Sequence, residues 1–182
     1  QPQPGDVAGL EGLIVASPAN PTGTMLGRAE LSALAEACDD QGTALISDEI
    51  YHGISYGPRA VSALEVTDTA YVINSFSKYF SMTGWRIGWM VVPASHVRIV
   101  ERLAQNMFIC APHASQVAAL GALGAYDEGA HDELEAHVET YRQNRALLLE
   151  GLGAAGLPVL SPADGAFYIY LDTSALAEDS RV

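Results

Sequence analysis

One stretch of the chain, residues 70–86, reads AYVINSFSKYFSMTGWR. Its first residues form an apolar, strand-like segment, and Lys78 follows among small hydroxyl residues. A lysine acts as a nucleophile only where burial or neighbouring cations keep part of it neutral. With Arg86 eight positions later, the stretch indicates an amine in a pocket that also binds an anion. The alternative is a strand-end lysine whose stem lies on apolar surface and whose ammonium reaches water.

Two earlier apolar runs also end in polar residues. The run 12–15 leads into a turn rich in Pro and Gly that carries Asn20, and the run 43–47 ends in Asp48 with Tyr51 three residues on. A lone Asp after a strand commonly just begins a turn. An open α/β sheet, however, binds its ligand at the carboxyl ends of its strands. Three successive strand ends of this kind therefore predict a ligand site that includes Lys78.

These motifs resemble a known family. Asn20-Pro21-Thr22-Gly23, Asp48 with Tyr51, and Ser75-Phe76-Ser77-Lys78 with Arg86 look like the signature of pyridoxal-phosphate-dependent aminotransferases of the aspartate aminotransferase superfamily, class I/II and fold type I. The resemblance runs in the family's order over nearly the whole chain. It implies an α/β fold: the central and C-terminal part of a mixed, mostly parallel sheet flanked by helices, then the start of a small α+β domain.

The resemblance implies a role in the chemistry for four residues. Lys78 would bond to the aldehyde of pyridoxal 5'-phosphate as an aldimine and then act as general acid and base. Asp48 would pair with the pyridine nitrogen and keep it protonated. Tyr51 and Asn20 would donate hydrogen bonds to the phenolate oxygen of the ring.

Three further residues would bind the phosphate. The resemblance implies that Arg86 grips it with its planar guanidinium, and that Ser75 and Ser77 add hydroxyl donors. The implied activity is transfer of an amino group between an amino acid and a 2-oxo acid. The Asn20-Pro21 peptide is a candidate for the cis form, because the turn must aim Asn20 at the cofactor.

The family is about twice as long as this chain, so the resemblance implies a fragment that is incomplete for turnover alone. Residues 1–130 would be part of the cofactor-binding large domain, 131–152 a long connecting helix, and 153–182 the start of the small domain. The start of the chain at Gln1 resembles a linker and not a targeting segment. The arginine for the substrate carboxylate would lie beyond Val182. The full-length protein would be a homodimer.

Other functions keep the same residues. A carbon–sulfur β-lyase or a cyclopropane-forming synthase of this fold would retain Lys78, Asp48 and Arg86 and send the carbanion elsewhere. An aminotransferase-like effector domain of a transcription regulator would need no turnover, and a helix-turn-helix segment upstream of Gln1 would indicate it. The residues that choose the substrate would lie outside this chain.

Composition excludes several other classes of protein. Of the 182 residues, 49% are hydrophobic and 17% charged, which suits a globular unit with a substantial core. Nine basic against twenty-two acidic residues give a net charge of −13, which argues against nucleic-acid binding. Residues 103–126 lack charge, but polar residues interrupt them, so we expect two packed helices and no membrane span.

Several lone polar residues have a simpler interpretation. Glu49 and His52 flank Asp48 and Tyr51, and we expect each to face a turn or solvent. Cys38 and Cys110 lie in apolar surroundings and are expected to be two buried thiols, which is consistent with a reducing cytosol and a cytoplasmic protein. His131 and His137 are not on one helix face, so no metal site is predicted.

Periodicity gives the elements around these residues. Apolar residues at helical spacing from Leu31 to Cys38 predict a helix that stops at Gly42. The first three strands should be parallel, because long connections separate them, and the resemblance suggests an antiparallel fourth. The other expected elements are strands at 86–92, 158–160 and 166–171 and helices at 95–106, 114–126 and 130–152.

Overall fold

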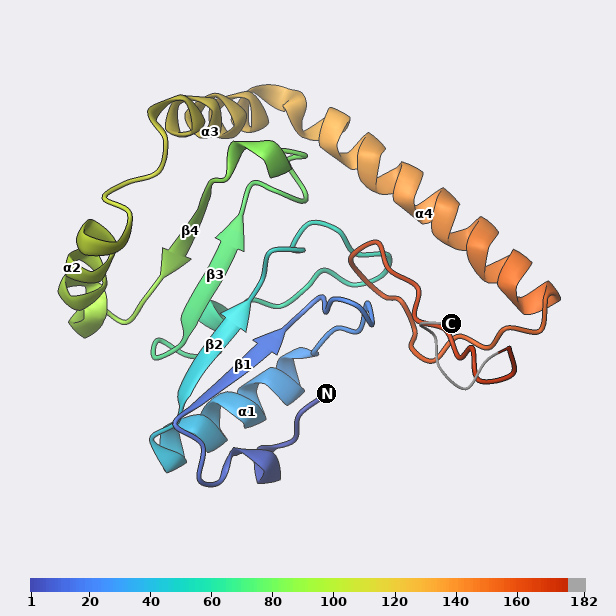
Figure 1. Cartoon of the computed structure of the whole chain (residues 1–182), viewed down its shortest axis with the longest axis horizontal. Helices are drawn as coiled ribbons and strands as arrows, with labels where there is room; N and C mark the ends of the chain where they lie inside the picture. The colour runs from blue at the N-terminus through green and yellow to red at the C-terminus, as the bar shows by residue number, and fades with distance from the viewer. Residues whose placement is uncertain (177–182) are drawn as a thin grey trace.

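The computed structural model describes residues 1–176, and within them a four-stranded sheet forms the centre (Figure 1). The strands stand in the order β1-β2-β3-β4. The first three, β1, β2 and β3, are parallel, and β4 is antiparallel to β3, so the predicted directions are confirmed. The bounds are Gly12–Ala16 for β1, Ala44–Asp48 for β2, Tyr71–Ser75 for β3 and Gly88–Val91 for β4.

Helix α1 (Arg28–Gln41) covers one face of this sheet. Its buried residues recur at the predicted helical spacing and pack against buried strand residues such as Val15, Leu45 and Val72. The helix ends as predicted at Gly42, which adopts a left-handed conformation with φ of 67°. Its N–H donates to the carbonyls of Asp39 and Cys38, so the last turn is closed before β2 begins.

The second half of the described chain is helical. Helix α2 spans Val97–Met107, α3 spans His113–Ala125 and α4 spans His131–Ala154, each within about two residues of its predicted bounds. A π-helical segment at Tyr126–Ala130 joins α3 to α4. The uncharged stretch 103–126 forms the end of α2 and the whole of α3, two helices as expected, and Figure 1 shows them lying apart from each other. Among the residues described, no helix has both the length and the apolar character that crossing a membrane requires.

The segment after α4 lies beside the loops that follow β1 and β2 (Figure 1). The expected strands at 158–160 and 166–171 are reduced to isolated bridges, Val159 with Leu171 and Ser55 with Gly165. The prediction of two strands was therefore wrong within the described residues. Leu160 N still donates to Tyr170 O, and hydrogen bonds from Gly165 N to Gly23 O and from Ala166 N to Ile54 O hold the segment against the earlier loops.

Two local expectations have opposite outcomes. The Asn20-Pro21 peptide is cis, as predicted, and so is Ser17-Pro18. Cys38 is buried, but Cys110 is exposed, so the prediction of two buried thiols was half wrong. Cys110 follows α2 in a connection where Phe108 and Ile109 are also exposed, and apolar neighbours in the sequence are no guarantee of a packed environment.

Candidate active site

The register of the parallel strands brings three strand ends to one edge of the sheet. Ala16 in β1 stands beside Asp48 in β2, which stands beside Ile73 in β3. The pairing continues past the strands, because Ser17 N donates to Asp48 O and Glu49 N donates to Ile73 O. The loops that carry the predicted site residues therefore leave the sheet side by side.

Lys78 and Arg86 line one cavity of about 410 Å³ at this edge. The hydroxyl residues Ser75, Ser77 and Thr83 line it as well. This is a cation-rich and hydroxyl-rich set of donors, which suits a phosphate, beside a primary amine, which suits an aldehyde. The volume falls in the range of small-molecule sites. Lys78 is moreover the only lysine of the 182 residues.

Local hydrogen bonds fix the loop between β3 and β4. Ser77 N donates to Ser75 Oγ at 3.1 Å, and Thr83 Oγ1 donates to the carbonyl of Ser77 at 2.7 Å. Arg86 has a left-handed backbone with φ of 52°, and its Nη1 donates to the carbonyl of Thr83 at 2.9 Å. The loop thus turns back on itself and places Lys78 and Arg86 on the same cavity. The strand predicted to begin at Arg86 begins instead at Gly88.

Aromatic rings form the wall beside Lys78. Its Nζ lies 5.5 Å from the centre of the Tyr51 ring and 5.7 Å from that of Phe167, within the reach of cation–π attraction. Tyr51 is 3% exposed, and its hydroxyl shares a hydrogen bond with that of Tyr168. Burial raises the pKa of Tyr51, and the hydrogen bond to Tyr168 and the charge of Asp48 raise it further. The phenol is therefore protonated and can donate.

Asp48 and Asn20 do not line the cavity that contains Lys78. Asp48 is half-buried at the end of β2, and its Oδ1 accepts a hydrogen bond from the N–H of Ile50 at 3.2 Å. Ile50 lines the Lys78 cavity, but Asp48 is not among its lining residues in the described part of the chain. Asn20 lines a separate cavity of about 450 Å³ with Ser161 and other residues. The structure thus groups Ser75, Ser77, Lys78 and Arg86, with Tyr51 against Lys78.

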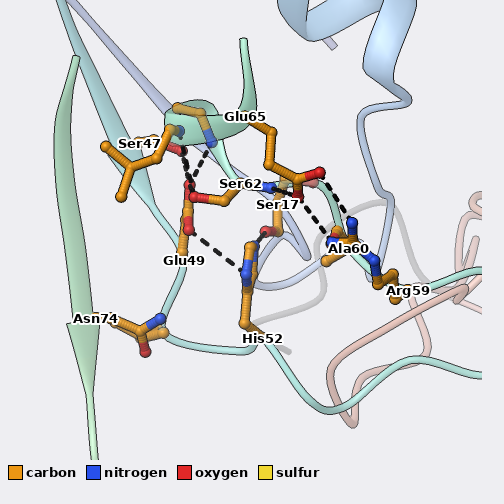
Figure 2. A network of polar contacts seen from close by, with 12 residues as sticks. Ser17, Ser47, Glu49, His52, Arg59, Ala60, Ser62, Glu65 and Asn74 are labelled. Atoms are coloured by element: carbon orange, nitrogen blue, oxygen red, sulfur yellow. Dashed lines mark hydrogen bonds and ion pairs between the residues drawn. The ribbon is translucent and has the colours of Figure 1, made fainter. Parts of the chain in front are cut away.

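Glu49 contradicts the expectation that it faces a turn or solvent. It is 2% exposed, and Figure 2 shows its carboxylate surrounded by donors. Its Oε1 accepts hydrogen bonds from the Ser47 and Ser62 hydroxyls at 3.1 Å each and from Ala63 N at 2.7 Å. Its Oε2 faces His52 Nδ1 at 3.4 Å.

His52 is also partly enclosed, with a side chain 20% exposed. The sequence offered one signal for Glu49, the serine two positions earlier, but the donors at Ser62 and Ala63 come from a distant turn. A carboxylate is buried only where several donors meet it, so such an environment is decided by the fold.

The fold agrees with the comparison to known proteins. The chain belongs to the aminotransferase class I and II family, whose family model matches residues 2–181. The resemblance seen in the sequence motifs is thereby confirmed, and so is the expected α/β fold.

Individual relatives support the same assignment. A valine–pyruvate aminotransferase of Mycobacterium tuberculosis is 47% identical over 173 residues, 94% of this chain and 44% of that protein. A solved protein of Silicibacter pomeroyi is 63% identical, with a TM-score of 0.92 over 100% of this chain and 48% of its own. The aspartate aminotransferase of Thermus thermophilus, solved with maleate, is 36% identical with a TM-score of 0.87 over 93% of this chain and 44% of its own. The chain spans less than half the length of the relatives it matches.

Proposed function

We propose that the full-length protein containing this chain is a pyridoxal-phosphate-dependent aminotransferase. One observation carries the proposal: the only lysine of the chain and Arg86 line the same cavity, together with three hydroxyl residues. A primary amine beside a phosphate-binding set is what a phosphorylated aldehyde cofactor requires. When bound, the cofactor supplies an electron sink that lets an amino group move between an amino acid and a 2-oxo acid.

Each residue of the site has a task in this proposal. Arg86 would hold the phosphate, with Ser75 and Ser77 donating from their hydroxyls. Lys78 would bond the cofactor through Nζ, and the same amine would carry a proton to and from the substrate. Asp48 would keep the pyridine nitrogen protonated.

The pKa of Tyr51 lies above its ordinary value because of burial, so its hydroxyl keeps the proton that it would donate to the ring oxygen. The corresponding role of Asn20 is proposed on the motif alone, since Asn20 lines a different cavity. Substituting Tyr51 and Asn20 one at a time would therefore measure the two proposed hydrogen bonds to the ring oxygen separately.

The substrate pair proposed is an amino acid and a 2-oxo acid. Because two relatives are named for valine with pyruvate and for arginine with pyruvate, pyruvate is the first acceptor that we would test. A homodimer is proposed for the full-length protein on the resemblance.

The first test is the covalent bond at Lys78. The full-length protein is mixed with pyridoxal phosphate, reduced with borohydride to fix the cofactor on any amine it is bonded to, and digested for peptide mass mapping. We expect the added mass on the peptide that contains Lys78 and no labelling of that site in Lys78→Ala. Absence of the label from Lys78 in the wild type would refute the proposal.

The second test separates phosphate binding from general charge. Arg86→Ala should weaken cofactor affinity by roughly ten- to a hundredfold, the size expected when a hydrogen bond to a charged group is lost. Arg98→Ala is the matched control, since Arg98 is exposed and pairs only with Glu101 in the described structure.

A third test follows the reaction itself. Incubation of the full-length protein and its cofactor with amino acids should yield the 2-oxo acid and the pyridoxamine form. Release of pyruvate and ammonia would instead indicate a β-lyase, and binding without turnover would indicate an effector domain.

A further inference from the structure

The strongest unexplained feature of the structure is the buried network around Glu49 and His52 (Figure 2). These two residues alternate with the proposed cofactor-binding residues Asp48 and Tyr51 along one turn. The carboxylate of Glu49 is buried, and the nearby Arg59 donates from Nη1 and Nη2 to Glu65 instead. A buried carboxylate without a cationic partner needs another source of compensation.

Hydrogen-bond chemistry fixes the tautomer of His52. Its Nε2 lies 3.0 Å from the carbonyl oxygen of Ser17, and a carbonyl can only accept, so Nε2 carries a proton. In a neutral ring Nδ1 would then carry a lone pair, and this lone pair would face the lone pairs of Glu49 Oε2 at 3.4 Å. A proton between the two atoms converts that repulsion into a hydrogen bond.

The surroundings of His52 oppose a full positive charge on its ring. Burial lowers the pKa of His52, while the charges of Glu49 and Glu65 act in the opposite direction and Arg59 acts with burial. The ring is thus discouraged from becoming fully charged, although it lies beside a carboxylate. A neutral pair with one proton satisfies both atoms at the least cost of desolvation.

The contacts of the pair connect three segments at the edge of the sheet. His52 reaches back to Ser17, which follows β1 in the loop that carries Asn20. Glu49 reaches across to Ser62 and Ala63 at the start of the 3₁₀ turn η2 (Ala63–Glu65). The turn itself is closed by the hydrogen bond from His52 N to Glu49 O at 2.9 Å.

We propose that Glu49 and His52 are a positioning pair, which holds one proton between Oε2 and Nδ1 and thereby fixes the turn that presents Asp48 and Tyr51 to the cofactor. This inference rests on the proposed cofactor function, but the shared proton is a property of the protein alone. The pair acts through a hydrogen bond and not through a net negative charge.

Two substitutions of Glu49 test the hydrogen bond against the charge. Glu49→Gln keeps an Oε1 acceptor for its three donors and offers an amide N–H to His52 Nδ1, so cofactor affinity should stay within about twofold of wild type. Glu49→Ala removes the acceptor of these three donors and also the partner of His52 Nδ1, so cofactor affinity should fall by about tenfold or more. Equal losses in the two variants would show that the charge matters and overturn the shared proton. Wild-type affinity in Glu49→Ala would overturn the positioning role.

A second comparison covers the case in which Glu49→Ala does not fold. The variant Glu49→Gln with His52→Ala leaves no buried charge, and its affinity should fall below that of Glu49→Gln by the same factor. Unchanged affinity there would overturn the proposal. His131→Gln is the matched control, because His131 and Glu135 form a similar pair at 3.7 Å with side chains about half exposed.

Nitrogen-15 NMR of the histidine rings supplies a readout that needs no cofactor. The Nδ1 resonance of His52 should move towards that of a protonated nitrogen in the wild type, towards that of an unprotonated nitrogen accepting a hydrogen bond in Glu49→Gln, and to that of a free acceptor in Glu49→Ala. A free Nδ1 in the wild type would overturn the inference. If the wild type shows the bonded nitrogen but takes up no pyridoxal phosphate, the proposed function fails while the proton assignment stands.

Discussion

At the scale of single residues, Glu65 shows what paired charges do for this acidic chain. Its carboxylate accepts hydrogen bonds from Nη1 and Nη2 of Arg59, at 2.7 and 2.8 Å, and also contacts Arg28. The hydrogen bond from Arg59 and that from the Ser62 N–H lower the pKa of Glu65 from 4.5 to about 2. The Arg59 side chain is 73% exposed to solvent, so the effect of the pair on stability is modest.

The sign of this pKa shift predicts a pH dependence. Because the folded-state pKa is lowered, the stabilisation is complete above the ordinary value of 4.5 and is lost as the pH falls towards 2. Urea unfolding over this range should give a steeper loss of stability for the wild type than for Glu65→Gln. Glu101→Gln is the control, because Glu101 lies in a more exposed pair with Arg98. Identical pH slopes for wild type and Glu65→Gln would contradict the prediction.

At the scale of elements, the pairing of β3 with β4 positions two residues that line the Lys78 cavity. Gly88 stands opposite Ser75, and both residues line the cavity. A Cβ on Gly88 would lie 2.5 Å from the carbonyl oxygen of Asn74 and 2.9 Å from the Ser75 Cβ. The close approach of the two strands therefore requires glycine at this position.

Gly88→Ala should push β4 away from β3, destabilise the protein by about 1–3 kcal/mol and weaken cofactor binding through Ser75. Gly84→Ala is the matched control in the same connection, since an added Cβ there meets no atom within 4 Å. Urea unfolding and cofactor titration measure the two effects. A Gly88→Ala variant as stable as Gly84→Ala would show that the strands relax freely.

At the scale of the whole molecule, α2 and α3 expose much apolar surface. Ile99, Leu103, Met107 and Leu120 are between 58% and 70% exposed. Isolated apolar side chains on a surface are ordinary, but contiguous apolar patches promote association. The net charge of −13 opposes association without covering the apolar side chains.

We therefore expect the isolated 182-residue chain to self-associate with rising concentration. Leu103→Glu with Leu120→Glu should reduce this association, as measured by sedimentation velocity. Gln105→Glu with Gln116→Glu adds the same charge on the same helices without removing apolar surface, and should have less effect. A wild-type chain that stays monomeric at every concentration would contradict the expectation.

Much of the architecture was predictable because its causes are local. The spacing of Leu31, Leu34 and Cys38 predicts the helix, and Gly42 predicts its end, since periodicity and turn chemistry act over a few residues. The segments at 158–160 and 166–171 were predicted wrongly, because a strand needs a neighbour at full register and only isolated bridges formed.

Sequence alone predicts the family, the parallel strands, and the residues Lys78 and Arg86 that lie on one cavity, since strand ends and loop length are encoded locally. Three features depend instead on how the chain packs: Glu49 is buried, Cys110 is exposed and Asn20 lines a separate cavity. A carboxylate can be buried only where hydrogen-bond donors replace water. Two of the donors to Glu49 are Ser62 and Ala63, which are distant in the sequence. The residues next to Glu49 in the sequence do not specify these donors.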